Sequence, residues 1–318
     1  MGKVDENKLE QLSKTLSGAL HWDSLHKHLY ATDASVYRML PLAVAYPKDE
    51  ADLIRLIHFA TTHQAGLIPR AAGTSLAGQC VGEGIVVDVS KHFTSILDLD
   101  RDKMQVRVQP GVIRDELNQY LQPFGLFFGP NTSTSNRCML GGMVGNNSSG
   151  TTSIRYGVTR DKVVALKAFL SDGSKVEFRE LTPEEVANKV QEQTLEGEIY
   201  KNLINELKNS DIAQNIVKEF PRAEIHRRNT GYAVDSLLEM APLSSGAGPF
   251  NLSKLLCGSE GTLALTTEIT LQLDRLPPPK AAMIVPHYST LEDSLSDVAP
   301  VMKHPLFMCE MMDKVILD

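Results

Sequence analysis

Apolar and polar positions along the first half of the chain follow helical and strand periods in turn. Acidic residues precede helically spaced apolar residues over 49–65, and Gly66 follows, which predicts a helix with a glycine stop. Short apolar runs at 67–69, 85–89, 95–99 and 104–108 predict strands, and a further helix is expected from Ile113 to Leu121. We therefore expect a mixture of helices and sheet.

The second half of the chain continues this mixture. Asp172-Gly173 separates two apolar runs, which predicts a β-hairpin. Residues 182–185 have the capping-box pattern with proline at the first helical position, so we expect helices in pieces from 183 to Phe220. From Leu263 to Leu273 every second residue is apolar except at Thr267, which predicts a half-buried strand.

A proline run at residues 277–279 is the natural domain boundary, because consecutive prolines stiffen the chain. After it we expect a strand at 281–285, a helix at 291–302, a strand at 306–309 and a short helix at 312–317. About forty residues cannot enclose a core alone. The predicted organisation is a helical segment over 1–35, a main domain over 36–275, and the beginning of a truncated second domain over 276–318.

Composition and charge favour a small-molecule ligand. The chain has 318 residues, 42% of them hydrophobic, a formal charge of −7 and a pI near 5.7, which argues against a nucleic-acid groove or an anionic-membrane patch. No apolar stretch is long enough to span a bilayer, so we expect a cytoplasmic protein, or one peripheral at the inner membrane. The four cysteines are far apart and are predicted to be buried rather than paired in disulfides or bound to an iron–sulfur cluster.

Residues 70–80 have the composition of an anion-binding loop directly after a predicted strand. Glycine lets backbone N–H groups converge on a phosphate, and hydroxyls add donors. A P-loop is excluded because Gln79 and Cys80 stand where lysine and Ser/Thr are required. A G-x-G-x-x-G fingerprint is absent, and residues 73–77 lack the closing glycine of a nucleophile elbow.

Two further segments share this composition. Residues 141–157 are rich in Gly, Asn, Ser and Thr but carry enough apolar residues to be packed, and residues 257–262 lie between two predicted strands. Taken alone, the first segment is more typical of a surface loop and the third of a tight turn, while the alternative for the second is a flexible linker. Three together favour a nucleotide site.

These three segments resemble the vanillyl-alcohol oxidase/p-cresol methylhydroxylase (PCMH) flavoprotein family over about residues 30–275. Within it they look like the branch of D-lactate dehydrogenase, the glycolate oxidase flavin subunit and D-2-hydroxyglutarate dehydrogenase. The resemblance implies an α+β, FAD-binding type-2 (PCMH-type) fold, with FAD between two α/β subdomains and the start of a substrate or cap domain after them.

The resemblance also implies which residues contact FAD. The first segment would wrap the pyrophosphate, the second would line the adenosine and isoalloxazine, and the third would lie near the adenine ribose, with Ile269 meeting the adenine. The implied residues are Pro69, Arg70, Ala71, Ala72, Gly73, Thr74, Ser75, Gln79, Pro130, Thr132, Ser135, Gly141, Gly142, Asn146, Ser148, Gly150, Tyr156, Gly157, Glu260, Gly261 and Ile269. Relatives that attach FAD covalently from the first loop use a histidine, and residues 70–79 contain none, so non-covalent binding is expected.

The implied activity is oxidation of a D-2-hydroxy acid such as D-lactate, glycolate or D-2-hydroxyglutarate. Electrons would pass to a quinone, an iron–sulfur domain or a carrier protein. The alternatives are an FAD-dependent oxidase of a sugar or alcohol, or a nucleotide-binding module without flavin. The family's substrate-site residues are expected beyond position 318, so no catalytic base and no metal ligand is predicted here. The histidines present, His26 and His28, partly buried His58, and His226, are interpreted as structural or surface residues.

Overall fold

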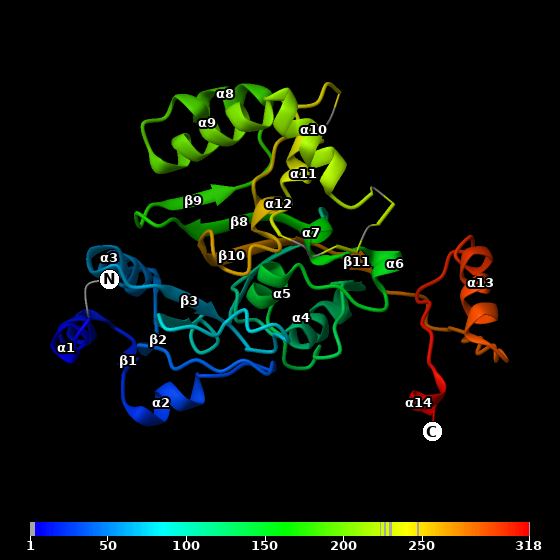
Figure 1. Ribbon diagram of the computed structural model, residues 1–318, viewed down its shortest axis with the longest axis horizontal. Coiled ribbons are helices and arrows are strands. Elements are labelled where there is room, and N and C mark those ends of the chain that lie inside the picture. Colours follow the sequence, from blue (N-terminus) through cyan, green and yellow to red (C-terminus); the bar gives the residue numbers. More distant parts are fainter. Residues whose placement is uncertain (1–3, 223, 226, 229–230, 247, 318) are drawn as a thin grey trace.

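The computed structural model describes residues 4–222, 224–225, 227–228, 231–246 and 248–317. Two β-sheets, each with its own helices, form the body of the protein, and a C-terminal segment lies to one side of them (Figure 1). The predicted α+β fold is confirmed. In the part of the chain that the structure describes, no helix has both the length and the apolar character needed to cross a bilayer.

The first sheet has four strands in the order β1 (Ala19–His21), β2 (Ala43–Tyr46), β4 (Ile85–Asp88) and β3 (Leu67–Arg70). The last three are parallel, and β1 pairs antiparallel with β2. All four residues of β4 are buried, as expected of a central parallel strand. Helices α1 (Glu6–Thr15) and α3 (Glu50–His63) contribute Leu9 and Leu53 to the core of this unit.

The second sheet is antiparallel, in the order β5 (Ile96–Asp100), β6 (Gln105–Val108), β10 (Leu265–Gln272), β8 (Val163–Phe169) and β9 (Lys175–Phe178). Strand β10 comes from far along the chain and fills the centre. Its residues alternate between buried and half-buried. Thr267 lies on the buried face and donates a hydrogen bond from Oγ1 to the Lys167 carbonyl at 3.3 Å, which explains how a polar residue interrupts the apolar pattern.

Helices gather around the second sheet, and α8–α12 lie together beside it (Figure 1). The remaining elements are α2 (Ser24–Leu29), α4 (Arg114–Leu121), the 3-10 turn η1 (Gln122–Phe124), β7 (Leu126–Phe127), α5 (Leu140–Asn146), α6 (Ser153–Tyr156), α7 (Thr159–Lys162), α8 (Pro183–Gln191), α9 (Leu195–Leu207), α10 (Ser210–Glu219), α11 (Val234–Leu238), α12 (Ser253–Leu256) and β11 (Asp274–Arg275), which pairs with β7. The apolar faces of β10 and of helices α4, α5, α8, α9, α11 and α12 form one continuous core.

Several local predictions need correction. Helix α3 ends on Gln64 in the left-handed conformation, two residues before the expected glycine stop. Residues 140–146 form helix α5 and not a loop, because Leu140, Met143 and Val144 share a buried face. The 257–262 segment follows helix α12 rather than a strand. Strand β1 within the predicted helical segment 1–35 belongs to the first sheet.

The segment after Leu276 contains α13 (Leu291–Val301) and α14 (Lys314–Leu317), but the strands expected at 281–285 and 306–309 do not form. A strand needs a neighbour to satisfy its backbone N–H and C=O groups, and the described structure provides none there. Most of this segment is exposed, including Cys309, whereas the other three cysteines are buried as predicted.

Candidate functional site

Three segments come together at the meeting point of the two sheets. We call them the first loop (69–80, after β3), the second segment (129–157, containing α5 and α6) and the third loop (257–262, between α12 and β10). Figure 1 shows α5 lying where the two sheets approach each other.

Gln79 connects all three segments through its side chain. Its Nε2 donates to Asn146 Oδ1 of the second segment at 3.1 Å and to Glu260 Oε1 of the third loop at 2.8 Å. Its Oε1 accepts a hydrogen bond from Ser75 Oγ at 2.5 Å. Asn146 also donates from Nδ2 to Ser148 Oγ at 3.0 Å. Four residues implied by the family resemblance therefore form one hydrogen-bonded network around Gln79.

Backbone contacts hold the third loop against the other two. Glu260 N donates to Gly145 O at 2.8 Å, and Gly258 N donates to Val144 O at 2.9 Å. Gly261 has a φ of +75°, and a Cβ added there would lie 3.0 Å from Pro69 Cγ, so glycine allows the close approach of the first and third loops. Pro69 and Gly261, two of the residues that the resemblance implies, thus lie close together in the fold.

The first loop offers hydrogen-bond donors to an anion. The backbone N–H groups of residues 72–76 have no hydrogen-bond partner among the described residues, and residues 72–75 are half-buried. The Arg70 guanidinium lies over the Tyr30 ring at 5.0 Å and donates to Thr32 O at 2.8 Å, so its charge is held beside the loop. Free N–H donors next to a fixed cation fit the pyrophosphate of FAD.

Gly142 adds a second observation that fits a dinucleotide. A Cβ built on Gly142 meets only Ala71 Cβ, at 3.9 Å, so the surface between α5 and the first loop is open. A flat group could approach the backbone there without meeting a side chain. The residues present therefore fit the cofactor that the resemblance implies.

The rest of the second segment is held in place by polar contacts. Arg114 Nε donates to Pro130 O at 3.1 Å, and Ser135 Oγ donates to Thr132 O at 2.6 Å. A Cβ on Gly150 would lie 2.2 Å from Asn131 O, so the backbone passes very close at that point. These contacts fix residues 130–135 and 150, but they do not connect them to Gln79.

Tyr156 and Gly157 end the second segment beside β7. The Tyr156 ring packs edge-on against Phe127, with 4.9 Å between centroids. Burial, with the nearby Asp274 carboxylate, raises the pKa of the Tyr156 hydroxyl. Its phenol therefore stays neutral at physiological pH.

Ile269 is the predicted residue that the structure places apart from the loops. Its side chain is fully buried in the core of the second sheet, and β10 is paired there with Val108 on one side and Leu166 on the other. The described contacts do not bring Ile269 to the network around Gln79.

Arg160 fixes the third loop and was not predicted from the sequence. Its Nη2 donates to Cys257 O at 2.5 Å and its Nε to Lys254 O at 3.1 Å, while Lys254 Nζ donates back to Arg160 O at 2.9 Å. Burial lowers the pKa of both cations. These partners are 94 and 97 positions apart, so no local pattern indicates them.

Two hollows on the described surface, of about 940 and 450 Å³, lie elsewhere. The first is lined by Arg101, Phe124 and Leu276, and the second by Trp22 and Leu42. Neither is lined by a residue predicted to hold FAD. The candidate site is thus separate from both of these hollows.

The histidines differ from one another in their surroundings. His58 is exposed, contrary to the partly buried position expected, because it lies outside the buried face that Leu53, Leu56, Ile57 and Ala60 form on α3. His226 lies outside the described residues. His26 is not simply a solvated residue, since its ring stacks on His21.

Comparison with known families covers two of the three segments. Residues 41–179, which include the first loop and the whole of the second segment, match the family model "FAD binding domain". This region belongs to the FAD binding domain family. The match implies FAD as the cofactor, and the resemblance noted from the loops is confirmed.

Relatives with described activities align over most of this chain. It is 36% identical over 291 residues to a D-2-hydroxyglutarate dehydrogenase of Pantoea ananatis, covering 91% of this chain and 28% of the relative. It is 35% identical over 291 residues to that of Escherichia coli, covering 91% and 28%, and 33% identical over 174 residues to glycolate oxidase subunit GlcD of Bacillus subtilis, covering 54% and 37%. The chain therefore spans less than a third of the length of these dehydrogenases.

Solved structures show the same fold. Alkyldihydroxyacetonephosphate synthase superposes with a TM-score of 0.59 at 18% identity, covering 86% of this chain and 41% of that one. 6-Hydroxy-D-nicotine oxidase from Arthrobacter nicotinovorans superposes with a TM-score of 0.53 at 15% identity, covering 83% and 43%. The architecture is that of PCMH-type FAD-binding flavoenzymes.

Proposed function

We propose that this chain is the FAD-binding part of a dehydrogenase of D-2-hydroxy acids and that it holds FAD non-covalently between its three segments. The observation that carries the proposal is the Gln79 network, because it joins segments 67 and 181 positions apart. This network lies beside the backbone N–H groups of residues 72–76, which have no hydrogen-bond partner among the described residues. The activity of the relatives supports the substrate class, since the D-2-hydroxyglutarate dehydrogenases align over 91% of this chain.

In this proposal the first loop binds the pyrophosphate through the N–H groups of residues 72–76, and Arg70 supplies positive charge. Gly142 lets the cofactor approach the backbone of α5. Glu260 and Gly261 lie near the adenine ribose. The remaining predicted contacts, Pro130, Thr132, Ser135, Gly150, Tyr156, Gly157 and Ile269, belong to the same proposal.

When bound, FAD would supply the acceptor for the hydride from C2 of the hydroxy acid, whose conversion to a 2-oxo acid also requires loss of the hydroxyl proton. The chain's own part is to bind and orient the cofactor: the Gln79 network fixes the spacing of the loops, and Arg160 fixes the third loop. We propose a quinone, an iron–sulfur domain or a carrier protein as the electron acceptor.

Titration with FAD tests the cofactor part of the proposal. Because residues 70–79 contain no histidine, we expect the protein to take up one equivalent of FAD, with a change in flavin fluorescence, and to release it on acid precipitation. A protein that remains colourless after mixing with FAD contradicts the cofactor assignment. Flavin that stays in the acid pellet contradicts non-covalent binding.

Anaerobic reduction tests the substrate class. The FAD-loaded whole protein is mixed with D-2-hydroxyglutarate, D-lactate or glycolate, and bleaching of the flavin near 450 nm, about the usual absorption maximum of oxidised flavin, is followed. We expect at least one of these three 2-hydroxy acids to bleach it, and L-2-hydroxyglutarate and L-lactate not to. Rapid reoxidation by oxygen after reduction by a sugar instead would support the oxidase alternative.

A further inference from the structure

A second cluster of polar side chains lies outside the FAD site, at the corner between β1 and α2. His21 is the last residue of β1, Asp23 is the N-cap of α2, and His26 lies in the first turn of that helix. Asp23 Oδ1 accepts a hydrogen bond from His26 N at 3.1 Å, so the same carboxylate begins the helix and holds the cluster together.

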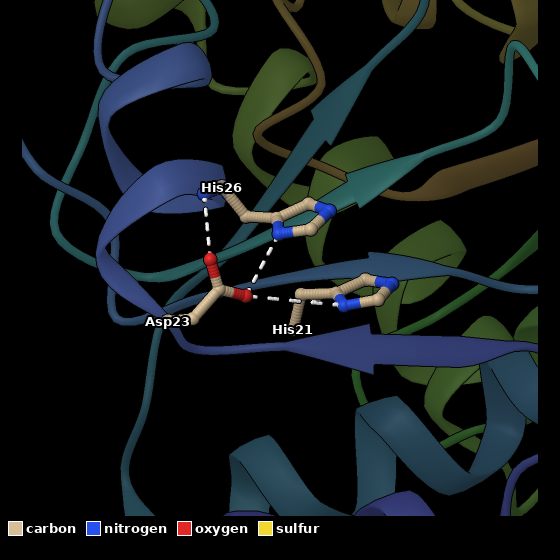
Figure 2. A group of neighbouring side chains, drawn as sticks. All are labelled: His21, Asp23 and His26. Atoms are coloured by element: carbon tan, nitrogen blue, oxygen red, sulfur yellow. Dashed lines mark hydrogen bonds and ion pairs between the residues drawn. The ribbon is translucent and has the colours of Figure 1, made fainter.

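The two imidazole rings and the carboxylate present three ligand atoms to one another. Asp23 Oδ2 lies 2.7 Å from His26 Nδ1 and 4.0 Å from His21 Nδ1. The rings are stacked, with centroids 3.8 Å apart and 6° between their planes. Figure 2 shows the Nδ1 atoms of both rings facing the Asp23 carboxylate.

This spacing is close to what a transition-metal ion needs. Tetrahedral ligands about 2.1 Å from a metal are on the order of 3.4 Å from each other. The observed separations of 2.7 and 4.0 Å bracket that value, and turning the two stacked rings toward Asp23 places the three ligand atoms around one ion. The backbone does not need to move, because each ligand stands on or next to a regular element.

Tyr46 and Lys91, next to the cluster, also affect how it can bind a cation. The Tyr46 ring meets both imidazoles edge-on, at 5.6 and 6.4 Å between centroids, and restricts their orientation. Lys91, over the other part of the Tyr46 ring at 4.6 Å, opposes a cation, and the Asp23 charge offsets it.

We propose that His21, Asp23 and His26 form a binding site for a divalent transition-metal ion such as Zn²⁺, with water in the fourth position. Two imidazoles and one carboxylate are a donor set that suits zinc and nickel rather than magnesium or calcium. The metal takes the place of the proton between His26 Nδ1 and Asp23. It joins the end of β1 to the start of α2 and stabilises the folded state by binding to it.

Equilibrium dialysis of the metal-free protein against Zn²⁺ alone tests the site, with Co²⁺ absorption in the visible range as a second measurement. We expect His21→Ala, Asp23→Asn and His26→Ala each to weaken Zn²⁺ binding by at least about tenfold. Asparagine preserves the helix cap at position 23, so that variant removes the charge without removing the cap.

His28→Ala is the matched control, because His28 lies on the same helix with its Nδ1 bonded to the Ser24 carbonyl at 2.7 Å. It should bind Zn²⁺ within about twofold of the wild type, since it removes a surface imidazole without removing a ligand. Circular dichroism checks that every variant is folded. Equal Zn²⁺ affinity in the wild type and in His21→Ala and His26→Ala overturns the proposal. FAD uptake is measured separately and does not bear on this outcome.

Discussion

Gly141 and Gly142 are neighbours in α5 but differ in the space around them. A Cβ on Gly141 would lie 2.5 Å from Pro110 Cβ, whereas a Cβ on Gly142 meets only Ala71 Cβ, at 3.9 Å. Gly141 therefore has a packing reason to be glycine. Gly142 has no such reason within the described structure. The open space beside it is explained if the cofactor lies against it.

Replacing these glycines separates packing from cofactor binding. We expect Gly142→Leu to change the free energy of unfolding by less than about 1 kcal/mol, since its side chain projects into open space, but to weaken FAD binding at least about tenfold by filling that space. We expect Gly141→Leu to cost about 1–3 kcal/mol through overpacking against Pro110. Thermal unfolding without FAD and an FAD titration measure the two effects. Normal FAD affinity in Gly142→Leu would show that the cofactor does not pass there.

At the scale of elements, Asp52 of α3 ties together the two chain segments at one end of the β1–β2 pair, the one that enters β1 and the one that leaves β2. Its fully buried carboxylate accepts hydrogen bonds from Ser17 N and Gly18 N, both at 2.8 Å, and from Lys48 N at 2.9 Å. Arg55 Nη1 donates to it at 3.0 Å. Burial opposes ionisation of this group, but these donors outweigh burial and hold the pKa of Asp52 below its usual 3.8.

The pKa of Asp52 predicts a pH dependence of stability. Because the folded pKa is depressed, the stabilisation is complete above the unfolded value and is lost as pH falls through the folded value. We expect Asp52→Asn to be about 1–3 kcal/mol less stable than the wild type near pH 7, with the difference shrinking below pH 3.8. Urea unfolding of both proteins between neutral and acidic pH measures it. Parallel stability curves at all pH values would mean that the carboxylate charge contributes nothing.

At the scale of the whole molecule, Gln79 links parts of the chain that belong to different sheets. The first loop follows the first sheet, while Asn146 and Glu260 belong to segments that pack on the second. The spacing of the loops around FAD therefore depends on how the two sheets meet. Gln79 acts as a positioning residue for that junction.

We expect Gln79→Ala to weaken FAD binding by about tenfold, since two interloop hydrogen bonds of about 0.5–1.5 kcal/mol each are lost. Gln193→Ala is the matched control, because Gln193 is exposed and bonds only to the Gln191 carbonyl. Fluorescence titration with FAD measures both variants, and circular dichroism confirms their folding. An equal loss of FAD affinity in the two variants would contradict a role for Gln79 in positioning the loops around FAD.

The sequence predicted much of the local structure because the spacing of apolar residues within a helix or strand shows which of its faces is buried. The hairpin at Asp172-Gly173, the capped helix at Pro183 and the alternating strand β10 all appear as expected. The strands at 281–285 and 306–309 do not, since an apolar run becomes a strand only beside a partner strand, and composition does not reveal the partner. The predicted domain boundaries at 35 and 275 remain predictions.

By itself, the sequence determined the kind of ligand: three segments rich in glycine and hydroxyl groups have the chemistry to hold a dinucleotide, and their residues carry the resemblance that the family match confirms. Only the tertiary structure decided that Gln79 joins them, that Arg160 holds the third loop, and that His21 and His26 stack beside Asp23. The physical reason is that the composition of a segment sets its own chemistry. The long-range contacts of Gln79 and Arg160 form only after the two sheets have packed, because packing brings distant segments within hydrogen-bonding distance.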